Sequence, residues 1–361
     1  HVHVGALGWN GFMLYGIIYW LTPRLYGTTL YSRKLGNAHF WLGTLGILFY
    51  VIPIYWAGIT QGLMWKQFTT DGVLQYPNFL ETVLQLIPMY LLRVVGGLLY
   101  LSGALLGLYN LIKTMRNGRF IRNVEFEAPP LHAADSGEDK TYWGHRWLES
   151  RPIRFTILAF LAIAIGSVIG NVPMFVIDSN IPTITKVKPY TPLEVEGRDI
   201  YTREGCVGCH SQMVRPFRNE TERYGEYSKA GEFVYDHPFL WGSKRTGPDL
   251  HRVGRKYPDA WHYNHMYDPT SMAPGSIMPP YPWLIEDRLD FTSLKAKIAA
   301  LRKIGVPYPY GYEDRAGDDL RAQAEEIAAA LQASGIETSW DREIIALIAY
   351  LQRLGTDINT D

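Results

Sequence analysis

Long apolar runs separated by polar connections occupy the first half of the chain, and this pattern stops near residue 180. Each run is about as long as the ~20 residues that a helix needs to cross a bilayer. The third run contains one charge, Arg93, and the others contain none. The pattern therefore predicts four transmembrane helices, at residues 4–21, 40–60, 82–112 and 155–177.

The second half, residues 181–361, is polar, charged and rich in Pro, Gly and Tyr, which is typical of a domain in water. Helices are predicted at residues 197–205 and 316–335, and the charges of the latter are expected to face water. Gly355 is a helix stop after a stretch with one apolar face. The chain as a whole is predicted to be mainly α. The apolar face consists of Ile344, Ile345, Leu347, Ile348, Leu351 and Leu354.

Basic residues are unevenly distributed among the connections, and this asymmetry predicts the topology. The first connection carries Arg24, Arg33 and Lys34, whereas the second carries only Lys66 as a base. We expect the first and third connections to be cytoplasmic. The second connection and everything after residue 177 should then lie in the periplasm of a Gram-negative cell. The third connection holds Lys113, Arg116, Arg119, Arg122, Lys140, Arg146, Arg151 and Arg154.

Residues 126–150 are rich in proline, acids and small side chains, so we expect a flexible cytoplasmic linker there. It precedes a membrane anchor at residues 151–180 and the periplasmic domain at residues 181–361. The chain has no initiator Met and opens within an apolar pattern, so we expect a truncated N-terminus with part of a helix missing. The formal net charge of zero argues against nucleic acid as a partner.

The sequence Cys206-Val-Gly-Cys-His210 reads C-x-x-C-H, the attachment pattern of a c-type haem, and contains the chain's only two cysteines. The thiols of Cys206 and Cys209 can add to haem vinyl groups, and His210 can ligate the iron. A zinc site would need further ligands at a suitable spacing, and a redox C-x-x-C would not need the histidine. We therefore expect one covalent haem c.

A low-spin haem c takes a second axial ligand, and methionine sulfur is the usual choice for a high potential. Met278 lies in a proline-stiffened loop, residues 275–282, that can hold a thioether at the iron. Met272 is an alternative ligand, and the remaining possibility is a methionine that only packs. Residues 246–250 resemble the proline loop that lies against the proximal histidine in class I cytochromes c, and the first and last helices resemble that fold.

His1 and His3 stand two residues apart at the start of the first apolar run. In an α-helix this spacing turns two side chains about 200° apart, so one helix can present a ligand to a haem on each flank. The alternative interpretation is a polar helix end at the membrane surface.

Three segments carry a resemblance to a known family. His1-Val-His-Val-Gly-Ala-Leu-Gly-Trp-Asn-Gly11 resembles the tenth helix of the catalytic subunit of cbb3-type cytochrome c oxidases. Gly205-Cys-Val-Gly-Cys-His-Ser-Gln-Met-Val-Arg-Pro216 and Gly275-Ser-Ile-Met-Pro-Pro-Tyr-Pro-Trp-Leu284 are similar to the membrane-anchored mono-haem cytochrome c subunit. The resemblance implies that residues 1–125 are the last three helices of the catalytic subunit. They would be fused to a mono-haem subunit at residues 141–361.

The same resemblance implies a set of cofactors. His1 would ligate the iron of the high-spin haem b at the oxygen site, and His3 would be one of two histidines on the low-spin haem b. The copper ligands, the active-site tyrosine and the second low-spin ligand would belong to earlier helices, outside this chain. By itself, the chain should therefore bind haem c without reducing oxygen.

Arg93 is the lone charge of the third apolar run. An arginine at the centre of a membrane helix costs ~2.5–3.5 kcal/mol on insertion scales and usually has a partner. It stands about three turns inside the outer end of its predicted helix, where haem b propionates would supply the opposite charge. Snorkelling and an inter-helix hydrogen bond are the alternatives.

These expectations combine into an electron relay in a bacterial inner membrane. Electrons would pass from haem c to the haem b and copper centre, with proton translocation implied by the family. The expected partners are the remaining catalytic helices, a dihaem cytochrome c subunit, a soluble or membrane cytochrome c donor, and lipid. Two alternatives stay open: a membrane-tethered electron-transfer cytochrome without a catalytic share, and a component of a nitric oxide reductase.

Overall fold

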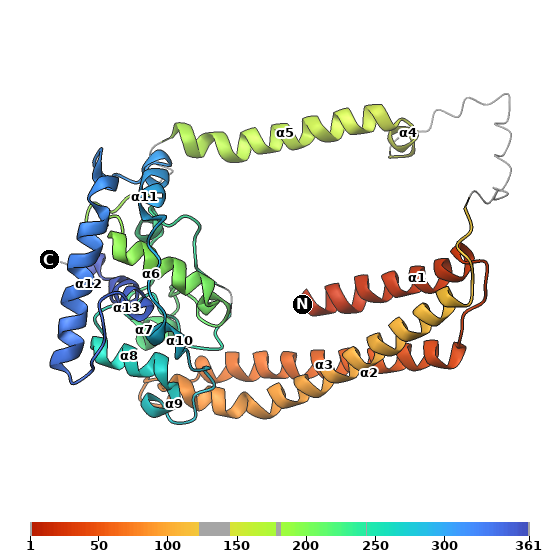
Figure 1. The fold of residues 1–361 in the computed structure, drawn as a ribbon, viewed down its shortest axis with the longest axis horizontal. Helices are drawn as coiled ribbons and strands as arrows, with labels where there is room; N and C mark the ends of the chain where they lie inside the picture. Colours follow the sequence, from red (N-terminus) through yellow and green to blue (C-terminus); the bar gives the residue numbers. More distant parts are fainter. Residues whose placement is uncertain (1, 123–144, 178–181, 243, 360–361) are drawn as a thin grey trace. The chain divides into compact units, whose positions relative to one another are not determined.

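The computed structural model describes residues 2–122, 145–177, 182–242 and 244–359. The chain divides into two compact units, His1–Thr60 with Leu86–Asp178 and Gln61–Gln85 with Ser179–Asp361. Within the described ranges the chain is helical, and β structure is limited to isolated bridges (Figure 1). The prediction of a mainly α protein is confirmed.

All four predicted membrane helices are present. The first is a π-helix, η1 (Val4–Gly11), continued by α1 (Phe12–Leu25), and the others are α2 (Arg33–Trp65), α3 (Phe79–Arg116) and α5 (Pro152–Val176). Each is long and apolar enough to cross a membrane. The π-helical opening differs from the regular α-helix that we expected, and a short helix, α4 (His145–Glu149), lies within the range expected as linker.

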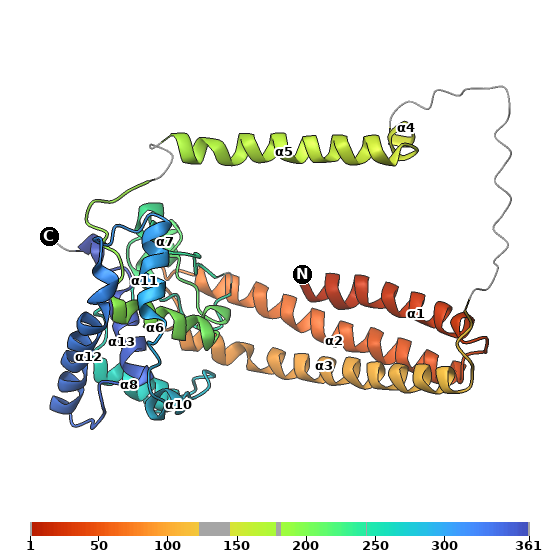
Figure 2. The ribbon, with the colours of Figure 1, turned by 45° about the horizontal axis from the view of Figure 1, so that its top comes forward.

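Helices α1, α2 and α3 lie side by side in both views (Figures 1 and 2). Glycine lets the backbones of α2 and α3 touch: a Cβ on Gly96 would lie 2.6 Å from the Tyr50 nitrogen and 2.7 Å from the Gly46 oxygen. Gly103 meets the backbone of His39 and Gly43 in the same way. Small residues of this kind are the usual means of close helix packing in lipid, where no hydrophobic effect drives association.

The second unit contains the C-terminal domain. Its helix α6 (Pro192–Arg203) begins with a capping box in which Thr191 and Glu194 satisfy each other's backbone N–H groups. The first part of the domain continues through η3 (Cys206–Gly208), α7 (Arg218–Tyr224), η4 (Ala230–Phe233), α8 (Asp259–Tyr267) and α9 (Pro269–Met272). It ends with α10 (Trp283–Glu286), α11 (Leu294–Lys303), η5 (Tyr312–Asp314), α12 (Ala316–Ala333), α13 (Glu343–Arg353) and η6 (Asp357–Asn359).

The predicted first and last helices of the domain, α6 and α13, cross in close contact. A Cβ on Gly197 would overlap the carbonyl oxygen of Ala346, so glycine sets how near the two helices come. The apolar face of α13 is fully buried, and each leucine or isoleucine on it contributes ~1.5–3 kcal/mol. Gly355 has a left-handed φ of +67° and ends the helix as predicted.

Candidate haem c site

The C-x-x-C-H motif lies just after α6. Gly205 takes a left-handed φ of +73°, and this turn leads into the single 3-10 turn η3. The His210 nitrogen donates to the Cys206 oxygen at 2.9 Å, which closes the motif on itself. Cys206 is half-buried against the core and Cys209 is exposed, and both thiols are free. The two thiols and His210 therefore lie on one compact turn.

His210 is held from two sides. Its Nδ1 lies 2.8 Å from the Pro248 oxygen, and because a carbonyl only accepts, Nδ1 carries the proton. This leaves Nε2 as the nitrogen for a metal, with the second hydrogen bond that ligating histidines usually make. Gly247 lies against the ring, since a Cβ there would come within 2.7 Å of both nitrogens. Burial lowers the pKa of His210, which favours the neutral, ligating form.

Asp249 joins the proline loop to the segment that follows the motif. One carboxylate oxygen accepts from the Ser211 hydroxyl at 2.6 Å and from the Met213 nitrogen at 2.8 Å. The other accepts from the His251 nitrogen at 2.9 Å. Asp249 is buried, so each of these bonds is shielded from water. The loop cannot move away from His210 without breaking them.

Arg245 extends this network behind the loop. Its side chain is 4% exposed and lies 2.7 Å from Glu220 and 3.4 Å from Asp249. It also donates to the Ser211 hydroxyl at 2.8 Å and to the Met213 oxygen at 2.9 Å. Burial raises the pKa of Glu220, but hydrogen bonds from Arg245 outweigh this and hold it below its usual value. The buried charges therefore compensate one another.

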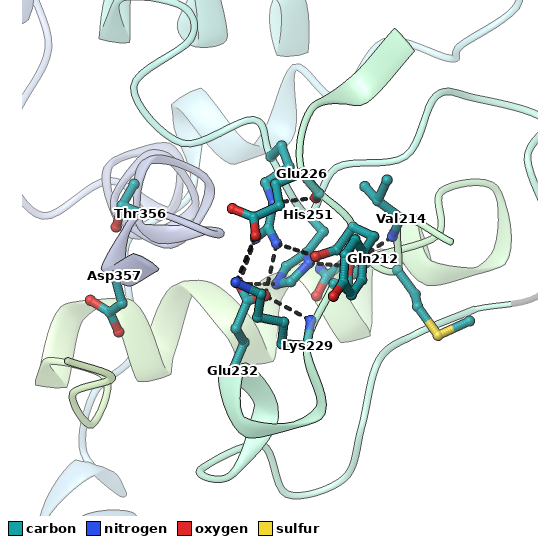
Figure 3. A network of polar contacts seen from close by, with 12 residues as sticks. Gln212, Val214, Glu226, Lys229, Glu232, His251, Thr356 and Asp357 are labelled. Carbon is teal, nitrogen blue, oxygen red and sulfur yellow. Dashed lines mark hydrogen bonds and ion pairs between the residues drawn. The ribbon is translucent and has the colours of Figure 1, made fainter. Parts of the chain in front are cut away.

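A second buried network surrounds the side chain of His251, whose backbone nitrogen is bonded to Asp249 (Figure 3). The Ser228 hydroxyl lies 2.5 Å from His251 Nδ1, and Glu232 lies 3.5 Å from Nε2. Glu232 also accepts hydrogen bonds from both terminal guanidinium nitrogens of Arg252, at 2.5 and 2.7 Å. Burial, and then the charge of Arg252, lower the pKa of His251 to about 3. The charge of Arg252 is paired with Glu232 by these two hydrogen bonds.

The methionine loop, residues 275–282, packs against the same hydrophobic core as Cys206. Met278 is half-buried and packs on the hydrophobic core that Cys206 also contacts. Its nitrogen donates to the Ser276 hydroxyl at 3.2 Å, and the Tyr281 nitrogen donates to the Met266 oxygen at 2.8 Å. The Trp283 indole donates to Glu204, just before the motif, at 3.0 Å.

The other methionines stand in different places. Met272 is the last residue of α9, and Met266 belongs to the buried core. The assignment of Met278 as the iron ligand stays a prediction.

The sequence reasoning missed two histidines on α8, His262 and His265. Both ring nitrogens of His262 and Nδ1 of His265 are buried without a hydrogen-bond partner among the described residues. A buried polar group left unpaired costs ~1–3 kcal/mol, so such a cluster indicates a polar group that belongs there. Thiols, a pre-oriented imidazole, a thioether loop and orphaned imidazole nitrogens together fit a haem. The only sequence signal was the three-residue spacing of the two histidines.

The connection between α2 and α3 belongs to the same compact unit as this domain. Arg218 donates to the Gly72 oxygen, and Arg223 donates to the oxygens of Tyr76 and Pro77 at 2.6 and 2.8 Å. Gln61 donates to the Arg245 oxygen at 3.1 Å. The two arginines use backbone acceptors of the connection, so their contacts depend on its shape more than on its side chains.

The remaining predicted site residues lie in the first unit. His1 lies outside the described residues. His3 is exposed, and its ring lies 4.9 Å from that of Tyr50. The half-buried Arg93 guanidinium lies 5.9 Å from the Tyr50 ring and 5.3 Å from the Tyr90 ring. The structure therefore brings His3 and Arg93 close to the same tyrosine, although they are far apart in sequence.

Comparison with known proteins separates the chain into two parts. Residues 145–358 match the family described as cytochrome c oxidase, mono-heme subunit/FixO. Residues 1–99 match the family described as cytochrome c and quinol oxidase polypeptide I.

Individual relatives match the N-terminal part. The chain is 52% identical over 116 residues to the cytochrome c oxidase subunit 1 homolog of Agrobacterium tumefaciens, covering 32% of this chain and 21% of the relative. It is 46% identical over 130 residues to cytochrome c oxidase subunit 1 of Rhodobacter capsulatus, covering 36% and 24%. It is 38% identical over 117 residues to the Cbb3-type cytochrome c oxidase subunit CcoN1 of Stutzerimonas stutzeri, covering 32% and 24%. The chain thus spans less than a quarter of the length of these relatives.

Proposed function

The chain belongs to the mono-haem cytochrome c oxidase subunit family, joined to a segment similar to subunit 1 of a cbb3-type oxidase, and from this we propose that it delivers electrons to the oxygen-reducing centre of a terminal respiratory oxidase. The observation that carries the proposal is His210, oriented by Pro248 and Gly247 beside two free thiols. This geometry prepares one imidazole nitrogen for an iron.

In this proposal, Cys206 and Cys209 hold one haem c through thioether bonds, and His210 and Met278 supply its axial ligands. When bound, the haem supplies one-electron chemistry at its iron. The protein's share is to fix His210 by Asp249, to present Met278 on a proline-stiffened loop, and to keep both ligands on a dry core. Relatives named as cytochrome c oxidases support two haems b and copper in the assembled enzyme, with the copper ligands on other helices.

His3, with His1, is proposed to ligate the haems b, and Arg93 to pair with haem b propionates. The position of Arg93 beside Tyr50 and His3 supports this, because a half-buried guanidinium in an apolar span needs an anionic partner. Arg93→Gln in the assembled complex should therefore alter the haem b spectrum and lower its potential. Arg116→Gln, at the end of α3, is the control and should change neither. An unchanged haem b in the Arg93 variant would refute the pairing.

We further propose that the α2–α3 connection and the cytochrome domain lie together in the periplasm of a bacterial inner membrane. The hydrogen bonds of Arg218 and Arg223 to this connection support a shared side, since both partners must lie in the same compartment. The distribution of lysine and arginine supports the same orientation. Proton translocation and partnership with a dihaem subunit and a cytochrome c donor follow from the family and are part of the proposal.

The test uses the assembled oxidase with both cysteines replaced by serine. Turnover driven by a reduced cytochrome c should fall to background, because the chain no longer holds haem c. Oxygen consumption after direct chemical reduction of haem b should persist. Donor-driven turnover at the unaltered rate would overturn the proposal. A complex that reduces nitric oxide and not oxygen would favour a nitric oxide reductase. Oxidase turnover by the isolated chain would refute the expected division of the active site.

A further inference from the structure

Two histidines of α8 stand one turn apart with ring nitrogens that no described group satisfies. His262 is 1% exposed, and neither of its nitrogens has a partner among the described residues. Nδ1 of His265 is also buried and has no hydrogen-bond partner among the described residues. By contrast, His210 and His251 are hydrogen-bonded to protein groups. Among the described residues, the buried imidazole nitrogens without a partner are therefore concentrated on one turn of α8.

This part of α8 is hydrogen-bonded to the methionine loop. The Met266 oxygen, next to His265, accepts from the Tyr281 nitrogen of the methionine loop at 2.8 Å. Met266 also belongs to the buried core on which Cys206 and Met278 pack. A haem bound through Cys206 and Met278 would therefore lie near α8.

Aromatic stacking fixes the orientation of His265. The Trp261 ring lies parallel to it, with centroids 4.5 Å apart and planes at 17°. Tyr257 stacks on the other side of Trp261, at 4.1 Å and 15°. Trp261 and His265 stand four residues apart on α8, and Tyr257 precedes the helix, so the three rings form one stacked column. Turning His265 toward water would break the column, so its buried Nδ1 is held in place.

Resting on the proposed function, we propose that His262 and His265 hold the propionate carboxylates of haem c, each donating one N–H to a carboxylate oxygen. Two neutral imidazoles supply two donors, and a haem carries two anionic propionates. The nearby buried cations are already committed, because Arg245 pairs with Glu220 and Asp249, and Arg252 pairs with Glu232. Each neutral imidazole can give one hydrogen bond to a carboxylate, and hydrogen bonds to an ionised group are the stronger kind.

The experiment compares leucine and glutamine at each position in the assembled complex. His265→Leu and His262→Leu remove the donor, whereas His265→Gln and His262→Gln keep an N–H. Without the donor the propionate charge is less compensated and stabilises ferric iron, so the midpoint potential of haem c should fall in the leucine variants. It should stay near the unaltered value in the glutamine variants. The sulfur-to-iron absorption band should persist in all four, which separates this effect from loss of Met278.

A matched control replaces a buried histidine that already has protein partners. His251→Leu should weaken the fold and leave the midpoint potential in place. Leucine variants that leave the potential unchanged would overturn the inference. The inference would also be overturned if the leucine and glutamine variants shifted the midpoint potential equally, since both substitutions would then act only through packing.

A second measurement applies if the leucine variants fail to fold. Infrared redox-difference spectra of the glutamine variants, carrying haem labelled with ¹³C in its propionate carboxyls, should show a displaced carboxylate band relative to the unaltered complex. An unmoved band in both variants would overturn the inference. An unsubstituted chain that carries no covalent haem would instead refute the proposed function. If haem is attached and ligated by Met278, but the midpoint potential and the carboxylate band do not change in the variants, only this inference is refuted.

Discussion

The two sides of the candidate haem pocket are built differently. On the histidine side, Asp249 and Arg245 tie the proline loop to the segment after the motif with buried, charge-assisted hydrogen bonds. On the methionine side, the loop around Met278 has prolines, a few backbone bonds and one indole contact. One ligand is therefore positioned by a rigid polar network, and the other by a stiff loop on an apolar core.

This difference suits the chemistry of each ligand. An imidazole must present a particular nitrogen, so its tautomer and ring plane need hydrogen bonds and close packing. A thioether has no proton to place and tolerates more rotation, so a half-buried loop is sufficient. Disturbing the histidine side should consequently damage the fold, whereas disturbing the methionine side should change the iron and largely spare the fold.

Removing Asp249 is expected to have the largest effect on stability. Asp249→Ala leaves Arg245 with one partner fewer and orphans the donors of Ser211, Met213 and His251. Breaking a buried charged network of this kind costs ~3–5 kcal/mol of unfolding free energy. Denaturant unfolding of the purified protein measures this, with Glu326→Ala on the exposed face of α12 as the control. A loss below ~1 kcal/mol would mean that the network is dispensable.

Gly247→Ala tests the close packing of His210. The added methyl group would collide with the imidazole ring, so either the loop or the histidine must move. Overpacking of this kind costs ~1–3 kcal/mol, and the yield of protein with His210-ligated haem should fall. Gly317→Ala is the matched control, since nothing lies within 4 Å of that position. Equal haem content in the two variants would contradict the packing argument.

Acid should destabilise the histidine side through His251. Its pKa is depressed in the fold to about 3, so the unfolded chain binds the proton more tightly. Stability is therefore present above the unfolded pKa of ~6.5 and falls as the pH decreases toward about 3, by up to ~1.4 kcal/mol per pH unit.

Unfolding midpoints across this pH range measure the effect. His251→Gln removes the titrating group, so its pH profile should be flatter over that window. Parallel profiles for the two proteins would show that His251 is not the source.

Met278→Leu should have the smallest effect on stability. A volume-conserving change at a half-buried position costs less than ~1.5 kcal/mol. The sulfur-to-iron absorption band should nevertheless disappear and the midpoint potential should fall, because thioether ligation raises it. Met272→Leu, at the end of α9, should retain both. Loss of the band in the Met272 variant alone would reassign the ligand.

The sequence was most informative where a signal is local or periodic. Apolar runs and helical spacing predicted the four membrane helices and α13, and C-x-x-C-H with residues 246–250 located the histidine side. Apart from Asp249, the partners of Arg245 lie 25 to 34 residues away along the chain, so no local pattern could reveal them.

The α8 histidines show the same limit. The spacing of His262 and His265 was visible in the sequence, but their missing partners emerged only when the fold buried them. The π-helical opening also has no simple periodic signal in the sequence.

The most direct test counts covalent haem on the purified full chain, expressed in cells that mature c-type cytochromes. After denaturation and extraction of free haem, one haem c should remain on each chain, and none should remain when Cys206 and Cys209 are both replaced by alanine. A folded, membrane-inserted chain without covalent haem would contradict the account.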